Sequence, residues 1–294
     1  MAVSQYRTER EMAERGIQYK TRGELQAMRA SGLILARAID AGRAVVRPGA
    51  TTGDVDAAVA AVIADAGAVS NFLNYGSHGG TGGFPATICA SVNDEVVHGI
   101  PGPRVLVEGD LLSIDAGCVL DGWHSDSAIS VHVGAPPSMA EVDLVNATEL
   151  AMWAGIAAAR AGGRLGDVSW AIQMSGEKSG VEDGRRYGSV SGYGGHGIGT
   201  AMHMDPFIPN QGKRGKGLRL TPGMALAIEP MLTLGKPSTN ELDDGWTVVT
   251  RDGARAAHFE HSVAICSDGI SVLTAADAGA AGLAGFGVEP ISLD

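Results

Sequence analysis

The stretch SIDAGCVLDGWHSDSAIS, residues 113–130, most constrains how this chain can fold, because it places two carboxylates in an otherwise apolar hairpin pattern. Asp115 follows an apolar run that begins at Leu111, and Asp126 precedes a second run that ends at Val131. The letters LDG between the two runs are typical of a turn that joins two antiparallel strands. The pattern therefore predicts a largely buried hairpin that carries two acidic side chains.

The two aspartates are expected on one face of this hairpin. A turn at residues 120–121 pairs Asp115 with Asp126. A turn at residues 121–122 pairs Gly117 with Asp126 instead, and Asp115 then lies two residues along. Side chains alternate with a period of two, so both registers give the same face. Like charges on one face repel, and burying them without partners costs several kcal/mol per ion. A cation between them is therefore expected.

Three further residues share this kind of setting. Glu229 interrupts the apolar stretch MALAIEPM, Glu260 lies in AHFEHSVAI, and His196 lies among glycines in GYGGHGIG. Four carboxylates and a neutral imidazole suit a pair of divalent cations. Two such ions about 3.5–4 Å apart, bridged by carboxylates, can hold a hydroxide as a nucleophile.

Each of the five residues has a more ordinary interpretation when it is considered alone. Such an aspartate is usually a turn residue, such a glutamate usually lies on a solvent face, and a single histidine is usually structural. Their common setting, on apolar strands or beside glycines, favours a metal site. GYGGHG also matches the G-x-G-x-x-G pattern, but the residues after it are not typical of a helix, so a dinucleotide site is rejected.

Composition excludes several classes of partner. The formal net charge is −11 and no block of basic residues occurs, which disfavours nucleic acid and acidic membrane surfaces. The first residues are charged and unlike a signal peptide, and no run of about 18 apolar residues could span a bilayer. Three cysteines without a C-x-x-C spacing suggest reduced thiols. The expected location is the cytoplasm.

Periodicity predicts alternating helices and strands. Helices are expected over residues 23–46, from 52–54 to 66, over 138–161 and over 165–176. A strand followed by a turn is expected over residues 88–98, two strands within 105–133, and further strands over 225–229, 246–250 and 258–265. The content of hydrophobic residues, 45%, is sufficient for a sizeable core around these elements.

An internal sequence repeat, called the internal echo below, suggests how these elements are arranged. RPGATTGDV at residues 47–55 matches RAGGRLGDV at residues 160–168, and both copies join two expected helices. Chance is one explanation, because glycine and alanine are abundant. We favour a duplicated half, which would give one α+β domain with a central antiparallel sheet and helices outside. We expect an N-terminal extension over 1–20, a catalytic domain over 21–274, and a weakly ordered Gly/Ala-rich tail over 275–294.

Several stretches together resemble the type I methionine aminopeptidases. They are SVNDEVVHGIP, SIDAG, DGWHSDSA, GYGGHGIGTAMHMDP, AIEPM, DGWTVVT and EHSV, in that order. The resemblance covers roughly residues 23–274. It implies the pita-bread fold, with two pseudo-symmetric halves around one sheet, and a cofactor of two divalent ions (Co, Mn, Fe or Zn). It also implies removal of the initiator methionine from nascent proteins whose second residue is small, by attack of a metal-held hydroxide on the first peptide bond.

The resemblance also assigns the metal ligands. Asp115 would chelate one ion. Asp126 and Glu260 would bridge both ions. His196 and Glu229 would complete the ligands of the other ion. These five positions match the family as a set, in order and spacing.

The remaining site roles follow from the same resemblance. His203 would bind the carbonyl oxygen and stabilise the oxyanion, and His98 would bind the scissile amide. Glu229 is also a candidate for proton transfer. An apolar pocket for the methionine side chain would comprise Phe84, Cys89, Met202 and Trp246. Without the resemblance, both histidines would be assigned structural roles, and Met202 and Trp246 could be core residues.

The chain departs from the family at NYGSHGGTGGFP, residues 74–85, which replaces a shorter turn. We expect a flexible lip here, with the roles of Tyr75 and His78 left open; an insertion without function is the alternative.

Two alternative functions are a related peptidase that acts on Xaa-Pro bonds and a binding protein that has lost the chemistry. The expected partners are peptides with an N-terminal methionine, with the ribosome as a further candidate and the chain as a monomer.

Overall fold

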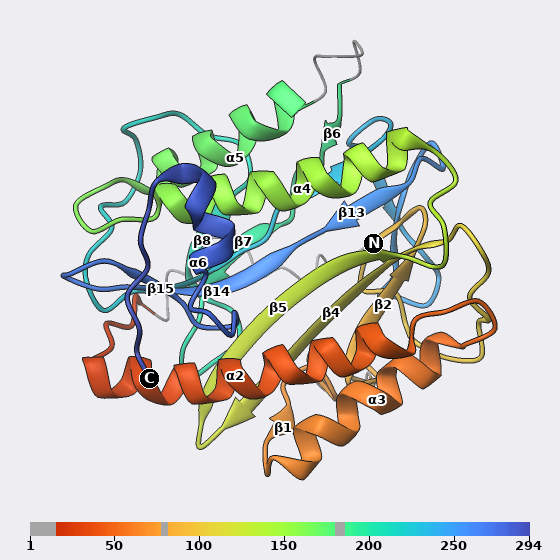
Figure 1. Ribbon diagram of the computed structural model, residues 1–294, viewed down its shortest axis with the longest axis horizontal. Helices are drawn as coiled ribbons and strands as arrows, with labels where there is room; N and C mark the ends of the chain where they lie inside the picture. Colours follow the sequence, from red (N-terminus) through yellow and green to blue (C-terminus); the bar gives the residue numbers. More distant parts are fainter. Residues whose placement is uncertain (1–15, 78–81, 180–185) are drawn as a thin grey trace.

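Two pairs of long helices enclose a curved sheet (Figure 1). The computed structural model describes residues 16–77, 82–179 and 186–294, so His78 lies outside the described residues. Helices α2 (Arg22–Val45) and α3 (Thr52–Asp65) form one pair, and α4 (Met139–Ala158) and α5 (Leu165–Ser179) form the other. None of the helices in these ranges combines the length and hydrophobicity that a membrane span requires.

The central sheet is antiparallel and has nine strands. Its main path runs β1-β4-β5-β14-β9-β7-β8, while β2 pairs with β4 and β15 pairs with β14. The strands are β1 (Val69–Ser70), β2 (Ile88–Val92), β4 (Leu111–Leu120), β5 (Trp123–His132), β7 (Gly194–Gly197), β8 (Met204–Pro209), β9 (Ala225–Ile228), β14 (Glu260–Ile265) and β15 (Ile270–Val272).

Two smaller sheets extend this framework. One has the order β13-β10-β6 and the other has the order β11-β12-β3. Their strands are β3 (Glu95–Val97), β6 (Gly188–Ser189), β10 (Met231–Thr233), β11 (Thr239–Glu241), β12 (Val248–Thr250) and β13 (Ala256–His258). The chain ends with the short helix α6 (Ala280–Leu283) and a single 3₁₀ turn, η1 (Ala284–Phe286).

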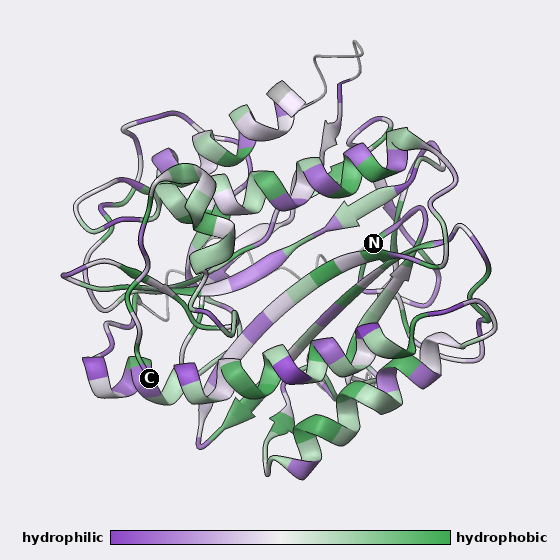
Figure 2. Cartoon of the chain, viewed as in Figure 1, coloured by the Kyte–Doolittle hydropathy of each residue, from purple (hydrophilic) through white to green (hydrophobic). Residues whose placement is uncertain are grey.

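Local capping explains where the first helices begin. The side chain of Thr21 accepts a hydrogen bond from the backbone of Glu24, whose carboxylate accepts one from the Thr21 backbone, which is a capping box. Thr51 and Asp54 form the same arrangement at the start of α3. Helix α2 is amphipathic, whereas α3 is mainly apolar with acidic residues near its ends, and Figure 2 shows this difference in hydropathy. Their apolar sides cover a core of sheet residues that includes Ile114.

The two copies of the internal echo occupy equivalent places. Residues 47–55 join α2 to α3, and residues 160–168 join α4 to α5. The third residue of each copy, Gly49 or Gly162, has a φ of 89° or 85°, a conformation that favours glycine.

The hydrogen bonding of the two copies also matches. Thr51 forms an isolated antiparallel bridge with Val105, and Arg164, at the same place in the second copy, forms one with Arg219. This repeated pattern confirms that the echo marks duplicated halves of one α+β fold rather than chance similarity.

The C-terminal segment is ordered, so the expectation of a weakly ordered tail over 275–294 was wrong. Leu283 and Leu293 are buried in the hydrophobic core. Gly282 packs so closely on Trp153 that an added Cβ would lie 2.1 Å from its ring. The small residues that suggested disorder instead permit close packing.

Candidate metal centre

The hairpin of β4 and β5 adopts the second of the two expected registers. Gly117 lies opposite Asp126, and Asp115 lies opposite Ala128. Asp121 and Gly122 form the turn, with φ values of 50° and 83°. Asp115 and Asp126 therefore lie on one face, and both line the same cavity.

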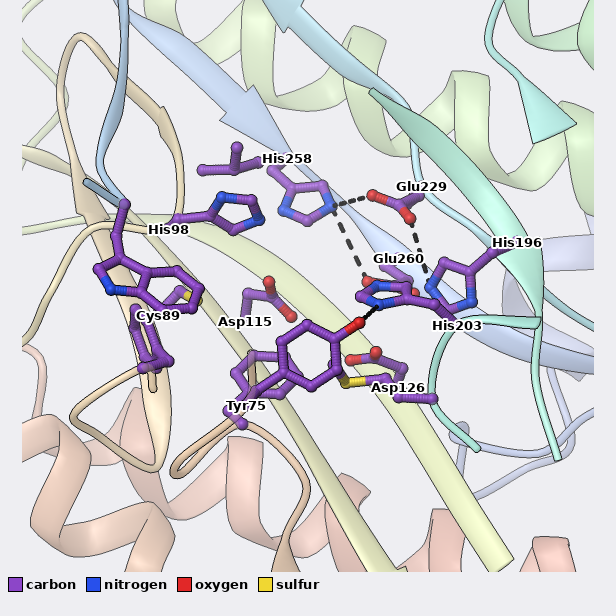
Figure 3. A pocket seen from close by; sticks show the side chains of 15 residues that line it. Tyr75, Cys89, His98, Asp115, Asp126, His196, His203, Glu229, His258 and Glu260 are labelled. Atoms are coloured by element: carbon purple, nitrogen blue, oxygen red, sulfur yellow. Dashed lines mark hydrogen bonds and ion pairs between the residues drawn. The ribbon is translucent and has the colours of Figure 1, made fainter. Parts of the chain in front are cut away.

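Neighbouring strands bring the other ligand candidates to this face. Glu260 begins β14, where it lies opposite Ala128 of β5. Glu229 directly follows β9, and His196 lies on β7 opposite Ala227 of β9. Five adjacent strands of the sheet (β4, β5, β14, β9 and β7) thus position the side chains, which converge on one cavity (Figure 3).

The distances suit shared ions. His196 Nε2 lies 3.6 Å from Glu229 Oε1. Candidate ligand atoms of Asp126, His196 and Glu260 all lie within 4.8 Å of one another. His196 Nδ1 lies 2.9 Å from the carbonyl oxygen of Gly197, to which it can donate a hydrogen bond. This bond leaves the Nε2 lone pair directed to the cavity, which is the form of histidine that binds metals.

Unsatisfied oxygen atoms show that a cation fits here. Asp115 Oδ1, Asp126 Oδ1 and Glu260 Oε1 are buried and have no hydrogen-bond partner among the described residues. No lysine or arginine of the described chain lines the cavity. Carboxylates buried in this way remain ionised only where an ion pair or a metal offsets their charge. Hard oxygen donors with one or more imidazoles are a typical ligand set for divalent transition metals.

The pKa values show how burial affects these groups before a cation binds. Burial raises the pKa of Asp115 to about 8. The pKa values of Asp126, Glu229 and Glu260 also lie well above their ordinary range, chiefly because of burial and then because of neighbouring carboxylates. Burial lowers the pKa of His196 to about 4, so this imidazole is neutral at physiological pH.

An apolar pocket adjoins the carboxylates. All four residues expected to hold a substrate side chain line the same cavity. Phe84 and Trp246 meet edge to face, with ring centroids 5.1 Å apart. Burial raises the pKa of the Cys89 thiol well above its ordinary value, so this cysteine remains an uncharged, apolar group.

Two more histidines complete the cavity as expected. The His203 ring lies 4.3 Å from the His196 ring, and the Tyr75 hydroxyl forms a hydrogen bond with His203 Nδ1. His98 is half-buried in the cavity wall, and desolvation of its ring lowers its pKa to about 4. Tyr75 belongs to the predicted lip, so the described part of this segment contributes to the site.

Sequence reasoning missed four residues of the cavity wall: Phe72, Tyr75, Val97 and His258. His258 was detectable, because it lies two positions before Glu260 and side chains alternate along extended chain. Its Nε2 atom lies 3.7 Å from Glu229 Oε2 and 3.9 Å from Glu260 Oε2. No comparable signal in the sequence indicated Phe72.

A buried carboxylate–histidine centre in a duplicated α+β fold is the arrangement of a metallopeptidase. The family model for metallopeptidase family M24 matches residues 26–267, and the chain belongs to this family. It is 51% identical over 261 residues to methionine aminopeptidase 1 of Mycobacterium tuberculosis, covering 88% of this chain and 96% of that protein.

Solved structures of methionine aminopeptidases also resemble this chain. The crystal structure of methionine aminopeptidase from Rickettsia prowazekii has a TM-score of 0.82 at 37% identity, covering 88% of this chain and all of that one. The methionine aminopeptidase from Thermotoga maritima has a TM-score of 0.82 at 38% identity, covering 88% of this chain and 99% of that one. The predicted family and the predicted pita-bread fold are thus confirmed.

Proposed function

We propose that this chain is a metal-dependent methionine aminopeptidase, which removes the amino-terminal methionine from polypeptides whose second residue is small. The observation that carries this proposal is the meeting of a buried tetracarboxylate–histidine centre and an apolar pocket in one cavity. The similarity of the chain to methionine aminopeptidases, over nearly the whole length of those proteins, supports this proposal.

The proposed cofactor is a pair of divalent ions, with Co, Mn, Fe and Zn all suited to the donor set. Asp115 would chelate one ion, and Asp126 and Glu260 would bridge the two. His196 and Glu229 would complete the ligands of the other. When bound, the ions supply an activated water as nucleophile and polarise the carbonyl group of the first peptide bond.

The chain's own residues then position the substrate and move its protons. His203 donates a hydrogen bond to the carbonyl oxygen of the first residue, and Tyr75 orients this imidazole through Nδ1. His98, which its low pKa keeps neutral, binds the scissile amide. Glu229 accepts the proton released from the attacking water and delivers it to the new amino group.

The pocket accounts for the preference for methionine. Phe84, Cys89, Met202 and Trp246 present rings, a thiol and a thioether, and this largely buried apolar lining disfavours a charged side chain. An unbranched thioether packs well against such ring edges. The preference over a side chain one methylene shorter should be about 1–3 kcal/mol.

We place the chain in the cytoplasm, as a monomer that acts on nascent polypeptides, with the ribosome as a partner. Support for a reducing compartment comes from the cysteines. Cys89, Cys118 and Cys266 are all buried and unpaired.

Release of methionine from the peptide Met-Ala-Ser tests the proposal. The metal-loaded full chain should release methionine, and chelation or Asp126→Ala should abolish this activity. Asp40→Ala, at an exposed position of α2, is the matched control and should remain active. Full activity of Asp126→Ala would overturn the proposal. Cleavage of an Xaa-Pro peptide alone would indicate the related peptidase, and hydrolysis of neither peptide would indicate a binding protein.

A further inference from the structure

His258, Glu229 and Glu260 form a second cluster of potential ligands on the wall of the cavity. Their candidate ligand atoms lie within 4.8 Å of one another, as do those of Asp126, His196 and Glu260. We propose that these three side chains bind an additional cation beside the two-ion centre. This inference rests on the proposed two-ion centre, whose ligands Glu229 and Glu260 it shares, but it does not depend on which peptide is cleaved.

The geometry fits a shared ion better than a hydrogen bond. His258 Nε2 lies 3.7 Å from Glu229 Oε2 and 3.9 Å from Glu260 Oε2, beyond the usual hydrogen-bond range of about 2.7–3.2 Å. Ligand atoms about 2.1 Å from a tetrahedral ion are separated by about 3.4 Å. His196 and Glu229, both expected ligands, show a similar separation of 3.6 Å. A small inward movement of His258 would complete the site.

His258 is held in place and has no other partner for this nitrogen. The residue is 2% exposed, and its Nε2 atom has no hydrogen-bond partner in the described ranges. The hydroxyl of Ser130 accepts a hydrogen bond from the His258 amide and donates one to its carbonyl, each 2.9 Å long. Figure 3 shows the ring directed toward Glu229 and Glu260. A buried nitrogen that lacks a hydrogen bond, lies next to two carboxylates and belongs to a residue with a fixed backbone is a ligand position.

The carboxylates divide their oxygens between the two clusters. Glu229 presents Oε1 to His196 and Oε2 to His258. One carboxylate can therefore bind a cation of the two-ion centre and the additional cation at once. The charge of two dications already offsets four carboxylates, so the additional cation should bind more weakly than the first two. One imidazole with two carboxylates favours a divalent transition metal over Mg²⁺ or Ca²⁺.

Titration with Co²⁺ tests this site in the full chain after removal of metals. Calorimetry gives the number and affinity of the ions, and visible absorption reports the ligands of Co²⁺. The wild-type chain should bind three ions, with the third at least about tenfold weaker than the others. His258→Gln removes the imidazole and should weaken the third ion by about 10–100-fold while the first two bind as before. The control is His132→Gln, which alters a half-buried histidine that lies on β5 and does not line the cavity.

The results of the titration either support or exclude the third ion. Saturation of the wild-type chain at two ions, or an unchanged third ion in His258→Gln, would overturn the inference. If the variant folds poorly, crystals of the wild-type chain soaked in Co²⁺ give the answer. An anomalous peak about 2.1 Å from His258 Nε2 would support the site, and a map without such a peak would exclude it. The titration needs no substrate, so failure of Met-Ala-Ser cleavage would leave its result intact.

Discussion

Burial keeps three histidines of the cavity neutral. It lowers the pKa of His196 and of His98 to about 4, and that of His258 to about 3. A neutral imidazole offers one lone pair and one N–H group. The same ring type can therefore act as a metal ligand at one position and as a hydrogen-bond donor at another, depending on what its other nitrogen contacts.

His203→Ala should lower kcat by about 10²–10³-fold, because one donor to the developing oxyanion is lost. KM should change little, since this hydrogen bond strengthens only in the transition state. Steady-state kinetics with Met-Ala-Ser measures both constants. Tyr75→Phe removes only the partner of Nδ1 and should cause a smaller loss. A His203→Ala enzyme with an unchanged kcat would contradict the proposed role.

At this scale the sequence indicated most of the cavity. The eleven residues chosen from pattern and resemblance all line it, although their individual roles remain proposals. Alternation of side chains was sufficient to place Asp115 and Asp126 together. It could not reveal that Tyr75 meets His203, because 128 residues separate the two and nothing in either local pattern specifies the contact.

Among the elements, the long helices could be predicted and the strands of two residues could not. Helices α2, α3 and α4 begin and end within about three residues of the predicted bounds, because their caps and apolar periodicity are local. Strands of two residues, such as β1 and β6, carry no periodic signal. They exist only because β4 and β10 offer edges to pair with.

A short connection between β7 and β8 carries part of the site, and the segment before α2 supports it. The Lys20 ammonium donates a hydrogen bond to the carbonyl oxygen of Ile198. Gln18 exchanges two hydrogen bonds of 3.1 Å with Thr200. The connection then continues to His203. The segment predicted as a mere extension thus helps to hold the connection that carries His203, the proposed donor to the oxyanion.

Lys20→Met should lower kcat/KM by about tenfold, because small displacements of a catalytic group are costly. Binding of the first two metal ions should not change, since the ligands lie on other strands or precede the connection. Steady-state kinetics and calorimetry with Co²⁺ separate these two effects. Lys213→Met, at an exposed position, provides the control. Equal activity of both variants would show that Lys20 does not position the connection.

In the whole molecule, the centre lies where the two halves meet. Asp115 and Asp126 come from the hairpin of the first half, whereas His196, Glu229 and Glu260 come from strands of the second. The C-terminal residue also contacts the first long helix, since Arg29 of α2 forms an ion pair with Asp294 at 2.9 Å. Stability and metal binding should therefore depend on contacts between distant parts of the chain.

Arg29→Met should lower the free energy of unfolding by about 2–4 kcal/mol. The buried guanidinium donates hydrogen bonds to carbonyl oxygens of Val272, Leu273, Ala275 and Ala276, and each buried acceptor left unpaired costs about 1–3 kcal/mol. Arg22→Met is the matched control on the same helix. Its ion pair with Asp268 is exposed and should contribute at most about 1 kcal/mol. Denaturant unfolding of both variants measures the difference, and similar losses would contradict a structural role for Arg29.

The metal-free chain should become less stable as pH rises from about 5 to about 8. Asp115 has an ordinary pKa of about 3.9 when unfolded, and burial raises its pKa to about 8 in the fold. The folded chain therefore binds more protons than the unfolded chain in this interval, and the stability present below the unfolded pKa is lost as pH rises through the folded pKa. Asp126, Glu229 and Glu260 shift in the same direction.

Cations should reverse this trend, because they replace protons on the carboxylates. The rise in melting temperature on adding Co²⁺ should therefore be larger at about pH 8 than at about pH 5.5. Thermal unfolding of chelated and loaded protein at both pH values checks this, and Asp115→Asn should flatten the dependence of the metal-free protein on pH. If the metal-free chain were instead stabilised across this interval, the four carboxylates could not be sharing a buried site that requires a cation.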